Sequence, residues 1–275
     1  CIHLLNKMRI LSFIIATFMT FASSANGISD WQLGFQTPAS DVMRNVYDLH
    51  NFVLIMMTGI TIFVLFLIFY VVFRFRRKVN PVASKTTHNT FIEILWTGIP
   101  VIILIFMAIP SFKLVYQQDV IPETDMTIKV IGHQWYWEYQ YPEHDDISYE
   151  SFMIPDDELE PGDIRLLTVD NNLVLPANKN IHVLVTAGDV LHSFAMPSLG
   201  VKKDAVPGRL NETWLNIDEP GIYRGQCSEL CGTGHGYMPI VIEALSEKDF
   251  KNWVIEQKSK LALANETTTK ENTIE

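Results

Sequence analysis

Residues 225–239 read GQCSELCGTGHGYMP, and this stretch is the most informative in the chain. Within it, Cys227, Cys231, His235 and Met238 follow one another at spacings of four, four and three residues. Thiolates, imidazoles and thioethers are ligands for soft transition metals. Four glycines in the stretch allow a loop to turn tightly around a centre. The pattern therefore predicts a metal site on a loop.

A further candidate ligand, His192, lies upstream, just after a predicted strand at Ile181–Thr186. One distant histidine combined with Cys, His and Met on a late loop is typical of β-sandwiches that bind copper. Here the loop contains a second cysteine. Two thiolates can bridge two copper ions, which leaves one histidine for each ion, with Met238 and a backbone carbonyl as weak outer ligands. Such a pair is suited to electron transfer rather than to substrate chemistry.

The sequence around the loop predicts a β-rich domain followed by a helix. Short β-favouring runs alternate with Pro-Gly turns, without intervening helical patterns, which predicts an antiparallel sandwich or barrel. A helix is expected from Ser246 to Lys260, and the polar residues 261–275 are expected to be disordered. The expected strands are Thr127–Ile131, Trp135–Tyr141, Ile164–Val169, Ile181–Thr186, Thr213–Ile217, Ile222–Gln226 and Pro239–Glu243.

Two apolar stretches precede this domain. Residues 51–73 contain no charge, and residues 91–112 contain one, Glu93. Each is long enough to cross a bilayer, and together they predict a transmembrane hairpin over residues 51–112. Glu93 has two interpretations: an interfacial carboxylate that reaches toward water, or a functional proton-entry group.

The loop between the helices, residues 74–90, contains five basic and no acidic residues, so it is expected on the inner side of the membrane. Residues 1–25 resemble an export signal: a basic start, a short apolar run and small residues after it. A third membrane helix is the alternative. Residues 26–50 would then be an exported stretch, and Cys1 would be absent from the mature protein. Both arguments predict that the β-rich domain is exported.

In an exported domain, the cysteines of residues 225–239 have other possible roles. Cys227 and Cys231 could form a disulfide, because the exported side is oxidising. Two cysteines and two histidines could instead hold a structural zinc ion. Neither alternative requires Met238 or the sandwich. A catalytic cysteine is disfavoured because no separate activating base is evident.

The composition limits the classes of partner. The 275-residue chain is 48% hydrophobic and has a net charge of −10, which excludes a disordered protein and disfavours nucleic-acid binding. The acidity is concentrated after residue 112, where 27 acidic residues face 13 basic ones. An acidic exported domain would attract a basic protein partner.

Five motifs together resemble subunit II of the haem–copper cytochrome c oxidases, from about Phe35 through the terminal helix. They are EILWT at 93–97, GHQWYW at 132–137, DVLHS at 189–193, DAVPGR at 204–209 and the Cys-Cys-His-Met loop. The resemblance implies an α+β membrane protein in which a two-helix hairpin precedes a cupredoxin-like domain over residues 113–260. It implies a two-copper centre, copper A, with ligands His192, Cys227, the Glu229 carbonyl, Cys231, His235 and Met238.

The same resemblance implies further roles. The Glu229 side chain would help to bind a magnesium ion shared with subunit I, Trp135 would receive electrons from cytochrome c, and Glu93 would lie at the entrance of a proton pathway. Asp146, Asp170 and Asp189 match acidic positions for cytochrome c docking. Gln140 departs from the pattern, since relatives carry a glutamate there.

The implied function is electron transfer from cytochrome c, through copper A, to haem a in subunit I, where oxygen reduction is coupled to proton pumping. Other oxidase subunits are implied partners. The host would be a bacterial or mitochondrial inner membrane, with the copper domain on the periplasmic or intermembrane-space side. The alternative from another class is a membrane-anchored protein that stores or delivers copper. A quinol-oxidising relative is disfavoured because such relatives lack the two thiolates, and a nitrous oxide reductase would need a further large domain.

Overall fold

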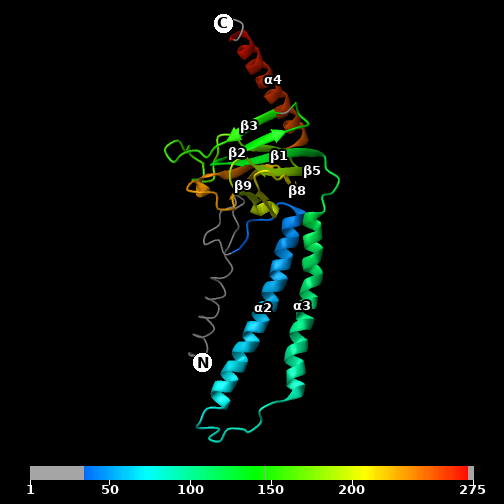
Figure 1. Ribbon diagram of the computed structural model, residues 1–275, viewed down its shortest axis with the longest axis vertical. Coiled ribbons are helices and arrows are strands. Elements are labelled where there is room, and N and C mark those ends of the chain that lie inside the picture. The colour runs from blue at the N-terminus through cyan, green and yellow to red at the C-terminus, as the bar shows by residue number, and fades with distance from the viewer. Residues whose placement is uncertain (1–33, 146, 272–275) are drawn as a thin grey trace, which may run out of the picture.

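The computed structural model describes residues 34–145 and 147–271. A long helical hairpin, a β-sandwich and a C-terminal helix follow one another along the molecule (Figure 1). This arrangement confirms the predicted fold class, a two-helix hairpin followed by a β-sandwich. The predicted signal-like segment 1–25, Asp146 and the last four residues of the predicted tail lie outside the described residues.

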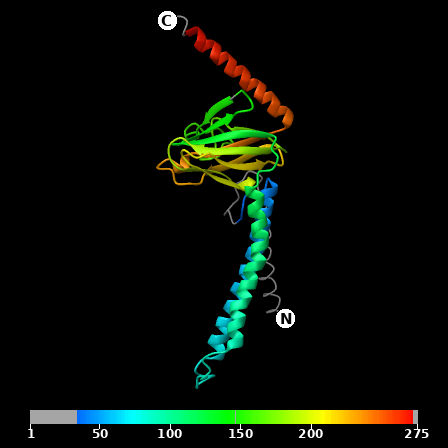
Figure 2. The ribbon, with the colours of Figure 1, turned by 45° about the vertical axis from the view of Figure 1, so that its right-hand side comes forward.

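The hairpin consists of α2 (Asp41–Arg74) and α3 (Thr90–Asp119). At about 1.5 Å per residue, these 34 and 30 residues extend about 51 and 45 Å, more than the roughly 30 Å hydrocarbon core of a bilayer. Both helices are apolar enough to cross a membrane, and most of their apolar side chains are exposed. The basic loop lies at the end of the hairpin that is farthest from the sandwich (Figure 2). The hairpin is therefore confirmed, with helices longer than the predicted segments 51–73 and 91–112.

The extra turns of α2 are fixed by the sandwich. Ser40 caps the helix: its Oγ accepts a hydrogen bond from Met43 N at 3.0 Å and donates one to Leu199 O at 2.8 Å. Val42 and Met43 are buried at this junction. Because of these tertiary contacts, the predicted exported stretch 26–50 contains the first turns of α2.

The sandwich is built from two five-stranded sheets, with strand orders β3-β2-β1-β5-β8 and β4-β10-β9-β6-β7. Buried residues alternate with less buried ones along strands such as β5, as expected when one face of a sheet covers a core. The strands are β1 (Met126–His133), β2 (Tyr136–Tyr141), β3 (Ile147–Ser151), β4 (Leu173–Pro176), β5 (Asn180–Ala187), β6 (His192–Met196), β7 (Val201–Ala205), β8 (Asn211–Asn216), β9 (Gly221–Cys227) and β10 (Pro239–Leu245).

Individual strands differ from the prediction in three ways. The predicted strand at Ile164–Val169 is irregular, and only Val169 makes an isolated bridge, to Met153. β3, β4, β6 and β7 were not predicted, because four- or five-residue strands carry little periodicity. β1 pairs with β5, and β4 with β10, in parallel. Parallel neighbours arise from crossovers between the sheets, which local sequence patterns do not reveal.

The closing helix, α4 (Glu247–Glu271), begins as predicted and continues beyond the predicted end. Asp249 N donates a hydrogen bond to Ser246 Oγ at 3.2 Å, and Phe250 and Val254 pack into the core. The expectation of a disordered tail from Leu261 is wrong for the residues up to Glu271. Alanine and leucine after Lys260 favour helix more than their polar neighbours suggested.

Candidate metal centre

Three strands bring the predicted ligands together. His192 is the first residue of β6, Cys227 is the last residue of β9, and these strands are paired so that Phe194 lies opposite Cys227. β9 and β10 are antiparallel neighbours, so the loop between them returns to its starting point and delivers Met238 just before β10. The loop therefore lies at one end of the sandwich, over the start of β6.

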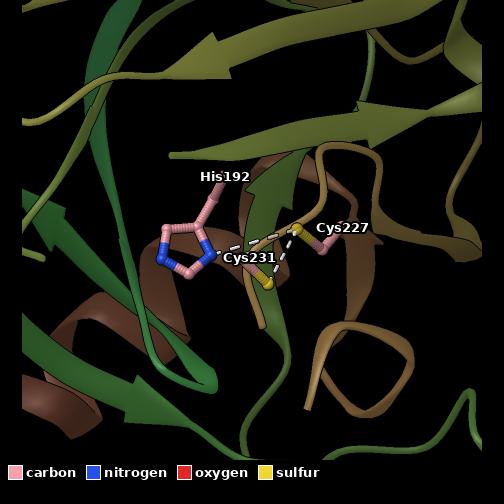
Figure 3. A group of neighbouring side chains, drawn as sticks. All are labelled: His192, Cys227 and Cys231. Carbon is pink, nitrogen blue, oxygen red and sulfur yellow. Dashed lines mark hydrogen bonds between the residues drawn. The ribbon is translucent and has the colours of Figure 1, made fainter. Parts of the chain in front are cut away.

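The first half of the site surrounds Cys227. Its Sγ lies 4.0 Å from His192 Nδ1, 3.9 Å from Cys231 Sγ and 3.4 Å from the carbonyl oxygen of Glu229. Figure 3 shows the imidazole pointing toward the two sulfur atoms. The ligand atoms of His192, Cys227 and Cys231 all lie within 4.8 Å of one another, and the three residues are buried.

The second half surrounds Cys231. Its Sγ lies 3.6 Å from His235 Nδ1 and 3.5 Å from Met238 Sδ. Met238 is buried, and His235 is half-buried in the short helix η3 (His235–Tyr237). The structure thus brings all six predicted donor groups together: two adjacent cysteine sulfur atoms, each with a histidine beside it, and the other two donors next to them.

This donor set discriminates between the readings left open by the sequence. The 3.9 Å between the sulfur atoms is about twice the 2.05 Å length of a disulfide bond, so the two thiols are free. A structural zinc ion needs four ligands, whereas six donors are assembled here, including a thioether. Sulfur and imidazole donors of this kind fit copper.

The electrostatics of the two thiols also fit a bound cation. Burial raises the pKa of Cys227, but hydrogen bonds with His192 and with backbone groups outweigh it and lower that pKa to about 6. Burial, followed by repulsion from Cys227, raises the pKa of Cys231 to about 12. Two adjacent thiolates at neutral pH therefore require positive charge between them, which metal ions supply.

Asp189 orients His192. His192 Nε2 donates a hydrogen bond to Asp189 Oδ1 at 2.9 Å, which leaves Nδ1 facing Cys227. Burial raises the pKa of Asp189, yet the bonds from His192 and from backbone N–H groups lower it below its usual value. A carboxylate behind a ligating histidine is a common device in metal sites. The sequence predicts Asp189 only as a docking residue, although its place three residues before His192 is also a signal for this role.

Trp135 lies outside β2 and against the ligand loop. Its Nε1 donates a hydrogen bond to the carbonyl oxygen of Cys231 at 3.2 Å. Trp137, Tyr139 and Tyr141 follow Trp135 at every second position, so the four aromatic residues could form one packed face of the strand. Trp137, Tyr139 and Tyr141 are indeed fully buried in the core. Trp135 is only partly buried and packs against the edge of this core.

The other predicted residues lie outside this cluster. Glu93 is half-buried in the first turn of α3, and Asp170 is exposed, with its Oδ1 accepting a hydrogen bond from Phe152 N at 2.7 Å. Two further residues contribute to the site without being predicted from the sequence. Trp137 Nε1 donates to Met238 O at 3.2 Å, and a Cβ on Gly225 would lie 2.0 Å from Ala195 O, so β9 can approach β6 only with glycine there.

Comparison with known proteins gives consistent matches along the chain. Residues 28–114 match the family model for the cytochrome c oxidase subunit II transmembrane domain, and residues 126–245 match the model for its periplasmic domain. A probable cytochrome c oxidase subunit 2 of Rickettsia felis is 52% identical over 257 residues, covering 94% of this chain and 80% of the relative. Cytochrome c oxidase subunit 2 of Zea mays is 46% identical over 254 residues, covering 90% of this chain and 97% of the relative.

Among solved structures, a similar one is the crystal structure of the periplasmic domain of subunit II of cytochrome oxidase of Bradyrhizobium japonicum. It is 49% identical, covers 51% of this chain and 99% of its own, and has a TM-score of 0.48.

Proposed function

Because the chain belongs to the cytochrome c oxidase subunit II family, we propose that it carries electrons from cytochrome c to subunit I of a membrane-bound respiratory oxidase. The observation that carries this proposal is the pair of buried sulfur atoms, 3.9 Å apart, each with a histidine nitrogen within about 4 Å. Two copper ions bound there would supply one-electron redox chemistry. Haem a and oxygen reduction, coupled to proton pumping, belong to the rest of the oxidase.

Each donor has a distinct task in this proposal. Cys227 and Cys231 would hold both copper ions, and His192 and His235 would each add a nitrogen ligand. Met238 and the Glu229 carbonyl would add weaker ligands. The sandwich keeps these groups in place and excludes water, since His192 and Met238 are almost completely buried. A rigid, dry ligand set suits rapid electron transfer, whereas a copper carrier needs ligands that exchange readily.

Electron entry is assigned to Trp135, because its indole contacts the backbone of the ligand Cys231. The acidic exported domain that contains Trp135 would attract a basic cytochrome c. The docking candidates are Asp146, Asp170 and Asp189. Asp189 would then serve both in docking and in orienting His192.

The membrane half is assigned to proton uptake and anchoring. Glu93, in the first turn of α3 beside the basic loop, is the proposed entrance of a proton pathway. The Glu229 side chain is the proposed ligand of a magnesium ion shared with subunit I. The basic loop predicts the orientation: the copper domain lies on the periplasmic or intermembrane-space side of a bacterial or mitochondrial inner membrane.

Electron paramagnetic resonance of the copper-loaded full-length chain in detergent tests the proposal. We expect one unpaired electron divided equally between two copper nuclei, and loss of this spectrum in Cys227→Ser and Cys231→Ser. Ser228→Ala, an exposed change in the same loop, is the matched control and should keep the spectrum. A spectrum from a single copper ion in the wild-type chain, or an unchanged spectrum in either serine variant, would refute the bridged pair.

A further inference from the structure

Gln134 contacts both sides of the candidate metal centre. Its backbone N–H donates to Asp189 Oδ2 at 2.7 Å, and its side-chain Nε2 donates to Cys231 O at 2.9 Å. We propose that Gln134 is a positioning residue that ties the His192 side of the centre to the ligand loop and keeps both in register with Trp135. This inference rests on the proposed function and adds a role for a residue outside the ligand set.

The first connection runs through Asp189. One carboxylate oxygen of Asp189 accepts the bond from His192 Nε2 at 2.9 Å, and the other accepts the bond from Gln134 N. The orientation of the His192 ring is therefore coupled to the position of the backbone at Gln134. Outer groups that orient a ligating histidine affect metal affinity in many sites.

The second connection runs through the carbonyl oxygen of Cys231. This oxygen accepts hydrogen bonds from both Gln134 Nε2 and Trp135 Nε1, at 2.9 and 3.2 Å. A carbonyl oxygen has two lone pairs, so the two donors together satisfy it. The peptide that follows the ligand Cys231 is thus fixed by two neighbouring residues of another part of the chain.

The loop leaves space for this contact. Gly232 has a φ of +117°, and a Cβ at this position would lie 3.1 Å from Gln134 Nε2 and 3.1 Å from Trp135 Cζ2. A larger residue would be strained in this conformation and would press on both donors. The absence of a side chain at Gly232 therefore leaves the space that the Gln134 side chain occupies.

Only a side chain with a donor of the right length can make the connection. Gln134→Glu keeps the shape and the backbone bond to Asp189 but places an acceptor against the Cys231 carbonyl. Gln134→Asn keeps the amide but is one methylene shorter. Asn171→Asp is the matched control, because Asn171 Nδ2 also donates to a backbone carbonyl, that of Glu150 at 3.0 Å, on the same domain.

Hydrogen–deuterium exchange of the metal-free full-length chain tests the inference without copper. We expect amide exchange in residues 228–238 to be about two- to tenfold faster in both Gln134 variants than in the wild type, as for the loss of one hydrogen bond. Exchange in β5 should be unchanged, which shows that the variants are folded. Asn171→Asp should leave the loop at the wild-type rate.

Copper retention against a chelator gives the second readout. We expect both Gln134 variants to bind copper about tenfold more weakly, at the low end of the effects seen for outer-shell groups. Wild-type exchange rates in the loop of both variants would overturn the positioning role. This result can be told apart from a failure of the proposed function. That failure would appear as an electron paramagnetic resonance spectrum without two coupled copper ions in the wild-type chain. The exchange rates of the loop, in contrast, are measured without metal.

Discussion

The indole ring of Trp135 lies directly on the backbone of Gly234: a Cβ on this glycine would be 2.2 Å from Trp135 Cδ2. The contact places the aromatic ring against the ligand loop one residue before His235. It explains why a small residue is needed at this point of the loop and leads to the first prediction.

Gly234→Ala is expected to push the Trp135 ring away from the loop and to slow the reduction of the oxidase by cytochrome c. Gly236→Ala is the control, because a Cβ there meets no atom within 4 Å. Turnover of the assembled oxidase with reduced cytochrome c measures the effect. Equal turnover in the two variants would show that electron entry does not depend on this contact.

Gly225→Ala is expected to destabilise the sandwich at the metal centre. Its Cβ would lie 2.0 Å from Ala195 O and 2.6 Å from Met196 Sδ, so β9 would have to move away from β6. Overpacking of this kind costs about 1–3 kcal/mol. Thermal unfolding measures the loss against Gly236→Ala, and an unchanged melting temperature would contradict the packing shown here.

Asp189→Ala is expected to weaken copper binding about 10- to 100-fold, because His192 loses the acceptor that orients its ring. Asp189→Asn should have a smaller effect, since its side-chain oxygen can still accept that bond. Chelator competition measures both affinities. Equal losses in the two variants would indicate that the charge of Asp189 matters more than its hydrogen bond.

Glu138 should stabilise the domain in a pH-dependent way. Burial raises its pKa, but hydrogen bonds from Gln140, Ser148 and His133 outweigh it and bring the pKa below the ordinary value of 4.5. A lowered folded-state pKa means that the stabilisation is present above pH 4.5 and is lost as the pH falls through the folded-state pKa.

Glu138→Gln should therefore be less stable than the wild type at about pH 7, with a difference that shrinks toward about pH 3. Thermal unfolding across this range measures the difference. The exposed change Glu158→Gln serves as the control. If the stability difference between Glu138→Gln and the wild type instead grows as the pH falls, folding raises the pKa of Glu138 rather than lowering it.

Reduction by cytochrome c should weaken as salt rises, because the part of the chain after residue 112 has twice as many acidic as basic residues. Between about 0.01 and 0.15 M salt the screening length falls from about 30 to 8 Å. A rise in the KM for cytochrome c, with little change in kcat, is the expected result. Asp170→Asn should reduce this salt dependence if its carboxylate lies in the docking surface, and a KM that is insensitive to salt would exclude electrostatic docking.

The sequence predicted the hairpin, the sandwich and the ligand types because each depends on local patterns. Uncharged runs of membrane length, short β-favouring runs between Pro-Gly turns, and the spacing from Cys227 to Met238 are all properties of neighbouring residues. The longer α2 was not predictable in this way, since its first turns are held by contacts with Leu199, which lies 159 residues from Ser40. In the segment Ile164–Val169 the local pattern predicts a strand that does not form. Its residues favour β-structure, but only Val169 makes a bridge, to Met153.

By itself, the sequence determined which donors this protein offers and on which side of the lipid they are expected, because charge, hydropathy and ligand chemistry belong to the residues. Only the tertiary structure decided how the donors meet. The pairing of β6 with β9 brings His192 to Cys227, and the return of the loop to β10 brings Met238 to Cys231. Asp189 lies only three residues from His192, but the bonds from Gln134 to Asp189 and to Cys231 join segments that are distant in the chain. Such contacts exist only once the sheets have packed.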